Sequence, residues 1–166
     1  MNGYQLAQLN IGIIKGPIDS PVMAEFVANL ERINALADAA PGFVWRLQTE
    51  AGDATAIRPF DDEHTLVNMS VWQDAESLRQ FVYHSAHAPI MRRRREWFER
   101  MQEAYVVLWW VPRGHRPDVS EAIARLTKLR TSGPGPEAFT FAALYPPPDA
   151  PASERPVGFA DTCPAT

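Results

Sequence analysis

Two histidines three positions apart are the side chains in this sequence best suited to acid–base chemistry. His84 and His87 lie in a segment, residues 83–89, that joins two predicted helices. Imidazole titrates near neutral pH, so either residue could act as a general base at the rim of a cavity. Either could also be an axial ligand of haem; alternatively, one caps a helix end while the other is exposed to solvent. We expect no metal site, because this segment offers no acidic third ligand at a fitting spacing.

A second group of polar side chains repeats at every other position of three predicted strands. Side chains alternate between the two faces of a strand, so these residues share one face of the sheet, while their neighbours in sequence form an apolar face. Such a mixture of amides, a hydroxyl, an arginine and a tryptophan resembles the lining of a small-molecule cavity. A solvated sheet face is the alternative. The group consists of Gln8, Asn10, Arg46, Asn68, Ser70 and Trp72.

Two further residues break a pattern. Asn34 lies on the apolar stripe of a predicted helix, where a buried amide needs a partner, and we expect it to hydrogen-bond the backbone near Gly42. Arg94 belongs to a run of arginines at 92–95. The other three each have a glutamate three or four positions away and are expected on a solvated face, whereas the neighbours of Arg94 are apolar. Arg94 therefore extends over apolar surface, meets a structural carboxylate, or points inward to an anionic ligand.

The elements that position these side chains follow from hydrophobic periodicity and turn residues. Strands are predicted at residues 4–14, 43–49, 66–72, 105–111 and 139–145, and helices at 21–39, 75–83, 89–103 and 118–129. Residues 52–64 are expected to form a hairpin excursion. The order β-α-β-β-α-α-β is the split pattern of a ferredoxin-like α+β fold, in which helices cover one face of an antiparallel sheet. We expect one such domain over residues 1–145, followed by a flexible Pro-rich tail over 146–166.

Composition limits the classes of protein that fit. The chain has 166 residues, a formal net charge of −4 and one cysteine, Cys163, so no intrachain disulfide can form. It lacks the basic and then apolar start of a signal peptide, and an apolar run long enough to span a membrane. Its acidic balance argues against a general nucleic-acid-binding protein, and it has no Gly-rich phosphate loop or nucleophile elbow. We therefore expect a cytoplasmic protein that binds neither nucleic acid nor membrane.

Six segments carry a resemblance to a known family: LAQLN at 6–10, GFVWRL at 42–47, NMSVW at 68–72, FVYHSAH at 81–87, RRREWF at 93–98 and LWWVP at 108–112. They resemble an uncharacterised bacterial family, a domain of unknown function, in the dimeric α/β-barrel superfamily. That superfamily includes antibiotic-biosynthesis monooxygenases, polyketide cyclases and haem-degrading enzymes. The resemblance implies a homodimer with a pocket between sheet and helices in each subunit, and it does not select a reaction. In the haem-degrading members the axial histidine lies on the helical segment after the third strand, which corresponds here to His84 and His87.

Three functional hypotheses follow. The leading one is a small-molecule enzyme, monooxygenase-like, that acts on an aromatic or polyketide-like metabolite. In it His87 is the base that forms an electron-rich anion able to react with oxygen without a bound cofactor, and Arg46 or Arg94 stabilises the negative charge. The alternatives are a haem-binding protein with His87 or His84 as axial ligand, and a non-catalytic protein that binds a small metabolite. The residues expected to bind the substrate, with Trp72 stacking on its ring, are Gln8, Asn10, Asn68, Ser70, Trp72, Arg94 and His84.

Overall fold

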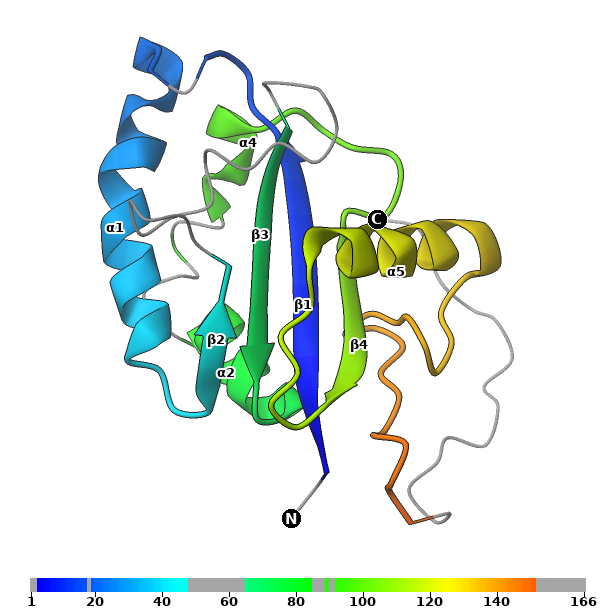
Figure 1. Cartoon of the computed structure of the whole chain (residues 1–166). Coiled ribbons are helices and arrows are strands. Elements are labelled where there is room, and N and C mark those ends of the chain that lie inside the picture. Colours follow the sequence, from blue (N-terminus) through cyan, green and yellow to red (C-terminus); the bar gives the residue numbers. More distant parts are fainter. Residues whose placement is uncertain (1–2, 18, 48–64, 85–88, 90–91, 152–166) are drawn as a thin grey trace.

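Four strands and the helices around them make up the described part of the chain (Figure 1). The computed structural model describes residues 3–17, 19–47, 65–84, 89 and 92–151. Its elements, in chain order, are β1 (Tyr4–Ile13), the 3-10 turn η1 (Pro21–Met23), α1 (Ala24–Asp38), β2 (Phe43–Arg46), β3 (Thr65–Trp72), α2 (Ala75–His84), α4 (Arg94–Trp97), β4 (Val106–Pro112) and α5 (Val119–Ser132).

The sheet has the strand order β2-β3-β1-β4, and every neighbouring pair is antiparallel. Combined with the βαββαβ connection, this order defines a ferredoxin-like fold and confirms the predicted class. β1 is central and pairs along most of its length with both β3 and β4. The register places Gln8 opposite Ser70, and Asn10 opposite Asn68, so that polar residues of two strands meet on one face.

The two faces of the sheet differ in composition and in cover. The apolar face consists of side chains that are all at most 5 % exposed, and α5 packs on it through Ala122, Leu126 and Leu129. On the mixed face Leu78 of α2 packs against Trp72 and Leu108. Figure 1 shows α5 crossing the near side of the sheet, with α2 behind it and α1 alongside the β2 edge. The apolar face is formed by Ala7, Leu9, Ile11, Val67, Met69, Val71, Val107, Trp109 and Val111.

The predicted strand at 139–145 was wrong. Only Phe139 pairs with β4, through two backbone hydrogen bonds with Leu108 of 2.8 and 2.9 Å. The backbone then turns, because Thr140 accepts hydrogen bonds from the N–H of Ala143 through both its carbonyl and its hydroxyl oxygen. The alternating apolar pattern instead serves to cover the mixed face, where Phe139 packs in the cluster around Trp72.

The predicted helix at 89–103 is also much shorter than expected. In the described residues of this stretch, α4 ends at Trp97, and Phe98 adopts an extended conformation. Phe98 forms a bridge with Ile14, flanked by the bonds Lys15 N–H to Trp97 O (2.9 Å) and Glu99 N–H to Ile13 O (2.8 Å). Pairing with the end of β1 therefore replaces further helical hydrogen bonds.

Residues 146–151, the described start of the predicted tail, lie against the folded domain. Ala150 is buried, and the carboxylate of Asp149 accepts a 2.7 Å hydrogen bond from Gly3 N–H at the start of β1. The rest of the predicted tail, like the hairpin expected at 52–64, lies outside the described residues. Among the helices that are described, none is long and apolar enough to cross a membrane.

Candidate functional site

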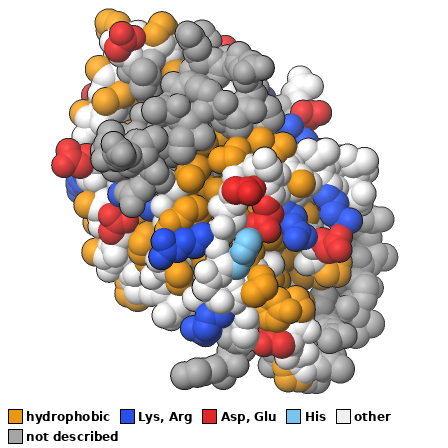
Figure 2. All heavy atoms as spheres, in the orientation of Figure 1, with side chains coloured by type: hydrophobic (Ala, Val, Ile, Leu, Met, Phe, Trp, Pro, Cys, Tyr) orange, Lys and Arg blue, Asp and Glu red, His pale blue; other side chains and the backbone are white. Residues whose placement is uncertain are grey.

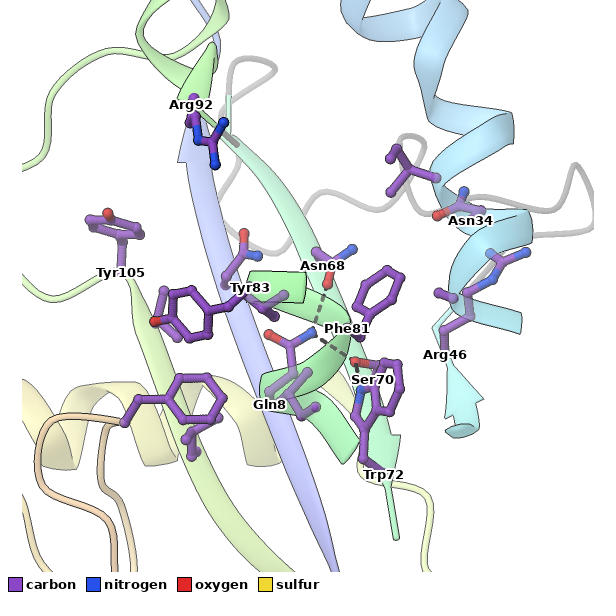
Figure 3. A pocket seen from close by; sticks show the side chains of 18 residues that line it. Gln8, Asn34, Arg46, Asn68, Ser70, Trp72, Phe81, Tyr83, Arg92 and Tyr105 are labelled. Atoms are coloured by element: carbon purple, nitrogen blue, oxygen red, sulfur yellow. Dashed lines mark hydrogen bonds between the residues drawn. The ribbon is translucent and has the colours of Figure 1, made fainter. Parts of the chain in front are cut away.

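A cavity of about 440 Å³ lies on the mixed face of the sheet (Figure 3). Such a volume is within the range of sites for small metabolites. Strands β1 and β3 provide its floor, α2 and the second half of α1 provide walls, and Phe141 comes from the segment after α5. The sequence-predicted residues that line it are Gln8, Asn10, Arg46, Asn68, Ser70 and Trp72.

The floor is a hydrogen-bonded group of neutral polar side chains. The amide nitrogen of Gln8 donates to Asn68 Oδ1 (2.7 Å) and to Ser70 Oγ (2.9 Å). Ser70 Oγ also accepts a 2.8 Å hydrogen bond from Trp72 Nε1. The contact between Gln8 and Ser70 follows from the antiparallel register, which sets the two residues directly across from each other. Gln8 and Ser70 are both only 7 % exposed, so their contact is a fixed part of the fold, whereas Asn68 is exposed where it lines the cavity.

These bonds determine what the floor can offer a ligand. Gln8 uses both amide hydrogens, which leaves its oxygen as an acceptor. Ser70 accepts two hydrogen bonds, so its own hydroxyl proton is available to donate. Asn68 accepts through its oxygen and keeps its NH₂ group. The floor therefore presents two donors and one acceptor, all uncharged.

The aromatic wall differs in one respect from the expectation. Trp72 stacks on Phe81 with ring centroids 5.2 Å apart, and Phe43 meets it edge-on at 5.5 Å. Trp72 is only 1 % exposed, so it offers no free ring face to a substrate. Phe81 also lines the cavity, and it is the ring that a ligand would meet on this side.

Arg46 is held at the junction of α1 and β2. Its guanidinium donates to both carboxylate oxygens of Asp38, at 2.7 Å and 3.2 Å. The turn between the two elements needs glycine at position 42, where φ is 81° and a Cβ would lie 2.1 Å from Ser77 Oγ. The Arg46 side chain is 14 % exposed, so the charge is presented from a fixed position at the cavity wall.

Three residues at the mouth of the cavity were not predicted. Arg92 and Tyr105 line it, together with Tyr83 of α2 (Figure 3). Arg92 was assigned to a solvated face because Glu96 lies four positions away, but Glu96 pairs with Arg93 at 2.6 Å. The sequence contains a signal for this outcome: the neighbouring arginines have few glutamates within pairing distance, so one of them can be left without a local partner.

Asn34 also belongs to the cavity. The predicted hydrogen bond to the backbone near Gly42 was wrong, since within the described residues the Asn34 amide has no hydrogen-bond partner. Its position on the inner side of α1 places the amide in the cavity wall instead (Figure 3).

Arg94 is not among the residues that line the cavity. It donates a 3.1 Å hydrogen bond to Ile11 O, and its guanidinium carbon lies 4.7 Å and 4.6 Å from the ring centres of Phe98 and Tyr105. Burial lowers the pKa of the Arg94 guanidinium from its usual value, while the nearby Tyr105 opposes this shift. The guanidinium of Arg94 thus packs on the ring of Tyr105, which itself lines the cavity.

The side chains of the two candidate histidines lie outside the described part of the chain. His84 is the last residue of α2, but its side chain lies outside the described residues, as does all of His87. Their roles as base, substrate contact or haem ligand therefore stay predictions. Titration of the purified protein with hemin tests the haem hypothesis, because a Soret band lost in His87→Ala or His84→Ala would identify the ligand. The described part of the chain has no group of three or more His, Cys, Asp or Glu that could hold a metal ion.

Comparison with known proteins gives one family match and distant structural similarities. The model of a domain of unknown function, DUF3291, matches residues 5–155. The chain shares 19% identity and a TM-score of 0.45 with SnoaB, a cofactor-independent oxygenase from Streptomyces nogalater, over 69% of this chain and 96% of that one. A conserved protein from Methanosarcina mazei Go1 shares 11% identity over 66% and 93% of the two chains, with a TM-score of 0.49. No curated protein sequence matches the chain. These similarities are too low to assign a reaction, and the fold assignment rests on the strand order.

Proposed function

The chain belongs to the DUF3291 family, and we propose that it is a monooxygenase-like enzyme that oxidises an aromatic or polyketide-like metabolite without a bound cofactor. The observation that carries the proposal is the cavity whose floor is the hydrogen-bonded group of Gln8, Asn68 and Ser70, beside the ring of Phe81. A fixed, uncharged hydrogen-bonding group beside an aromatic ring suits a flat substrate that carries oxygen substituents.

In this proposal the chemistry begins with removal of an acidic proton from the substrate. His87 acts as the base, and the resulting carbanion or enolate is electron-rich enough to give an electron to O₂. The Ser70 hydroxyl and the Asn68 amide donate to the substrate oxygen on which negative charge collects. Arg46, fixed by Asp38, adds positive charge at the wall. Because these donors are already in place, they need no rearrangement as charge develops.

Oxidation of 1,8-dihydroxyanthrone tests the proposal. Its acidic methylene is converted to a carbonyl, with one oxygen atom of O₂ entering the product and the other leaving as water. We expect protein-dependent O₂ uptake and quinone absorbance above the spontaneous rate, and we expect both to fall in His87→Ala and Arg46→Ala. Full turnover in both variants would contradict the assigned roles, and no acceleration of this or related anthrones would contradict an oxygenase of this class.

A non-catalytic metabolite-binding protein is the second candidate. Among the described residues that line the cavity there is no carboxylate and no imidazole, so that part of the site contains no ready base. A binding protein needs the cavity but not the base. In that case His87→Ala would keep its affinity for the anthrone, and turnover would be absent in the wild-type protein as well.

Homodimerisation stays a prediction. The apolar sheet face is buried within one chain, and Figure 2 shows side chains of both charges on the outer surface of α5. A barrel formed sheet against sheet would therefore require α5 to leave this face. Light scattering on the full chain measures the mass, and a monomer at all concentrations would contradict the prediction.

A further inference from the structure

Among the described residues that line the cavity, the charged side chains are all arginines. Arg46 and Arg92 are among its lining residues, and the lining that the structure describes includes no aspartate or glutamate. Positive charge in a cavity with low-dielectric walls attracts anions and disfavours cations.

The two arginines differ in the partners of their guanidinium groups. Arg46 is paired with Asp38 through two hydrogen bonds. Arg92 has no hydrogen-bond or ion-pair partner among the described residues, and its guanidinium points toward the cavity in Figure 3. The planar fork of a guanidinium matches the geometry of a carboxylate. Arg92 is therefore the group at the mouth that is free to bind an anion.

At the opposite end of the cavity the floor is neutral, and Arg46, which lies across from Ser70 in the sheet, is already paired with Asp38. In Figure 3 Arg92 enters from the top, while Ser70 and Trp72 lie toward the bottom of the view. The floor at that end offers the Ser70 hydroxyl and the Asn68 amide as donors, which suit a carbonyl or phenolic oxygen. The two ends thus select different oxygen groups on one ligand.

We propose that the substrate of this cavity is a planar aromatic carboxylate with a carbonyl or phenolic oxygen at its far end. The carboxylate pairs with Arg92 at the mouth, the ring lies along Phe81, and the far oxygen accepts hydrogen bonds from Ser70 and Asn68. This inference rests on the proposed function, because it names the substrate class of the same cavity.

The test compares an acid with its neutral ester. Isothermal titration calorimetry measures the binding of 6-hydroxy-2-naphthoate and of its methyl ester to the full chain at neutral pH and low salt. We expect the acid to bind about tenfold more tightly, because it adds a charge-assisted pair with Arg92. Added salt should reduce this preference, since Arg92 is exposed at the mouth.

Two arginine variants assign the preference to one residue. In Arg92→Gln the acid should fall to the affinity of the ester, with the ester unchanged within about twofold. Arg95→Gln removes the same charge from an exposed position three residues away that does not line the cavity, and it should keep the preference. Equal binding of acid and ester to the wild-type protein, or equal weakening of both in Arg92→Gln, would overturn the anionic substrate class and leave the proposed oxygenase standing for neutral substrates. Absence of binding by either compound would overturn the inference, while anthrone oxidation tests the proposed function separately.

Discussion

The two faces of the same four-stranded sheet are built by alternate residues of the same strands, yet they serve different purposes. On one face a cluster of apolar side chains is buried, and α5 packs on it. On the other face Gln8 donates hydrogen bonds to Asn68 and Ser70 at the floor of a cavity. A one-residue step along a strand therefore separates a position that holds the fold from a position that can hold a ligand. The comparison predicts that substitutions on the two faces have different consequences.

The largest effect is expected on the apolar face. Leu126 of α5 is 1 % exposed and packs in the cluster under the sheet, so Leu126→Ala should lower the free energy of unfolding by about 2–5 kcal/mol. Leu144, at 41 % exposure, is the matched control, and Leu144→Ala should change the free energy of unfolding by about 0.5 kcal/mol or less. Urea denaturation measures both. A small loss in Leu126→Ala would mean that α5 is not an integral cover of this face.

The next effect joins stability and binding. Ser70→Ala removes the acceptor for both Gln8 and Trp72, and the unpaired buried donors should cost about 1–3 kcal/mol. The same change should weaken binding of 6-hydroxy-2-naphthoate, whereas Leu126→Ala should weaken it only through unfolding. Ser132→Ala, at the exposed end of α5, is the control and should leave both quantities unchanged. Normal stability in Ser70→Ala would show that the floor is not fixed as described.

A third change should affect rate with little effect on stability. Arg46→Gln removes positive charge from the cavity wall and should lower kcat for anthrone oxidation about tenfold or more. The fold should tolerate it, because the partner Asp38 is half exposed. Arg32→Gln, on the exposed side of α1, is the control for loss of one charge. An unchanged kcat in Arg46→Gln would remove Arg46 from the catalytic group.

The smallest effect is expected for a surface ion pair, between Lys128 of α5 and Glu137. A hydrogen bond from Lys128 lowers the pKa of the Glu137 carboxyl, with a smaller contribution from the charge of Arg125. A lowered pKa in the folded state means that the contribution to stability is present above the unfolded pKa and is lost as the pH falls through the folded value. Lys128→Gln should raise the pKa of Glu137 in an NMR titration, whereas Arg100→Gln should not. No change in Lys128→Gln would show that this pair does not form in solution.

The order of the predicted elements was enough to predict the fold class, and residue alternation was enough to predict the floor of the cavity. Gln8, Asn10, Asn68 and Ser70 were assigned to one face from the sequence, and all of them line the cavity, because strand parity fixes the face of a side chain whatever packs above it. The same parity correctly placed Trp72 on this face. It could not show that Phe81 would cover the indole ring, since that depends on how α2 sits on the sheet.

Residues that enter the site from helices and connections were missed for the same reason. Arg92, Tyr105 and Asn34 reach the cavity only because the chain returns over the sheet in a particular path. From the sequence, Glu96 could pair with Arg92 or with Arg93. Only the three-dimensional structure shows that it pairs with Arg93. Likewise the pairing of Phe98 with Ile14, which shortens α4, is a non-local contact that helical periodicity does not reveal.

The central position of β1 has a consequence for how the chain is made. β1 is synthesised before both of its partners, and it pairs on one side with β3, at residues 65–72, and on the other with β4, at residues 106–112. Both hydrogen-bonding edges of β1 therefore stay unpaired until strands much later in the chain have been synthesised. Pairing them closes long stretches of chain, which makes folding slow. Until β4 emerges, a strand as apolar as β1 exposes an edge that can pair with another nascent chain. The strand at the middle of the finished sheet is thus the one most in need of protection during synthesis.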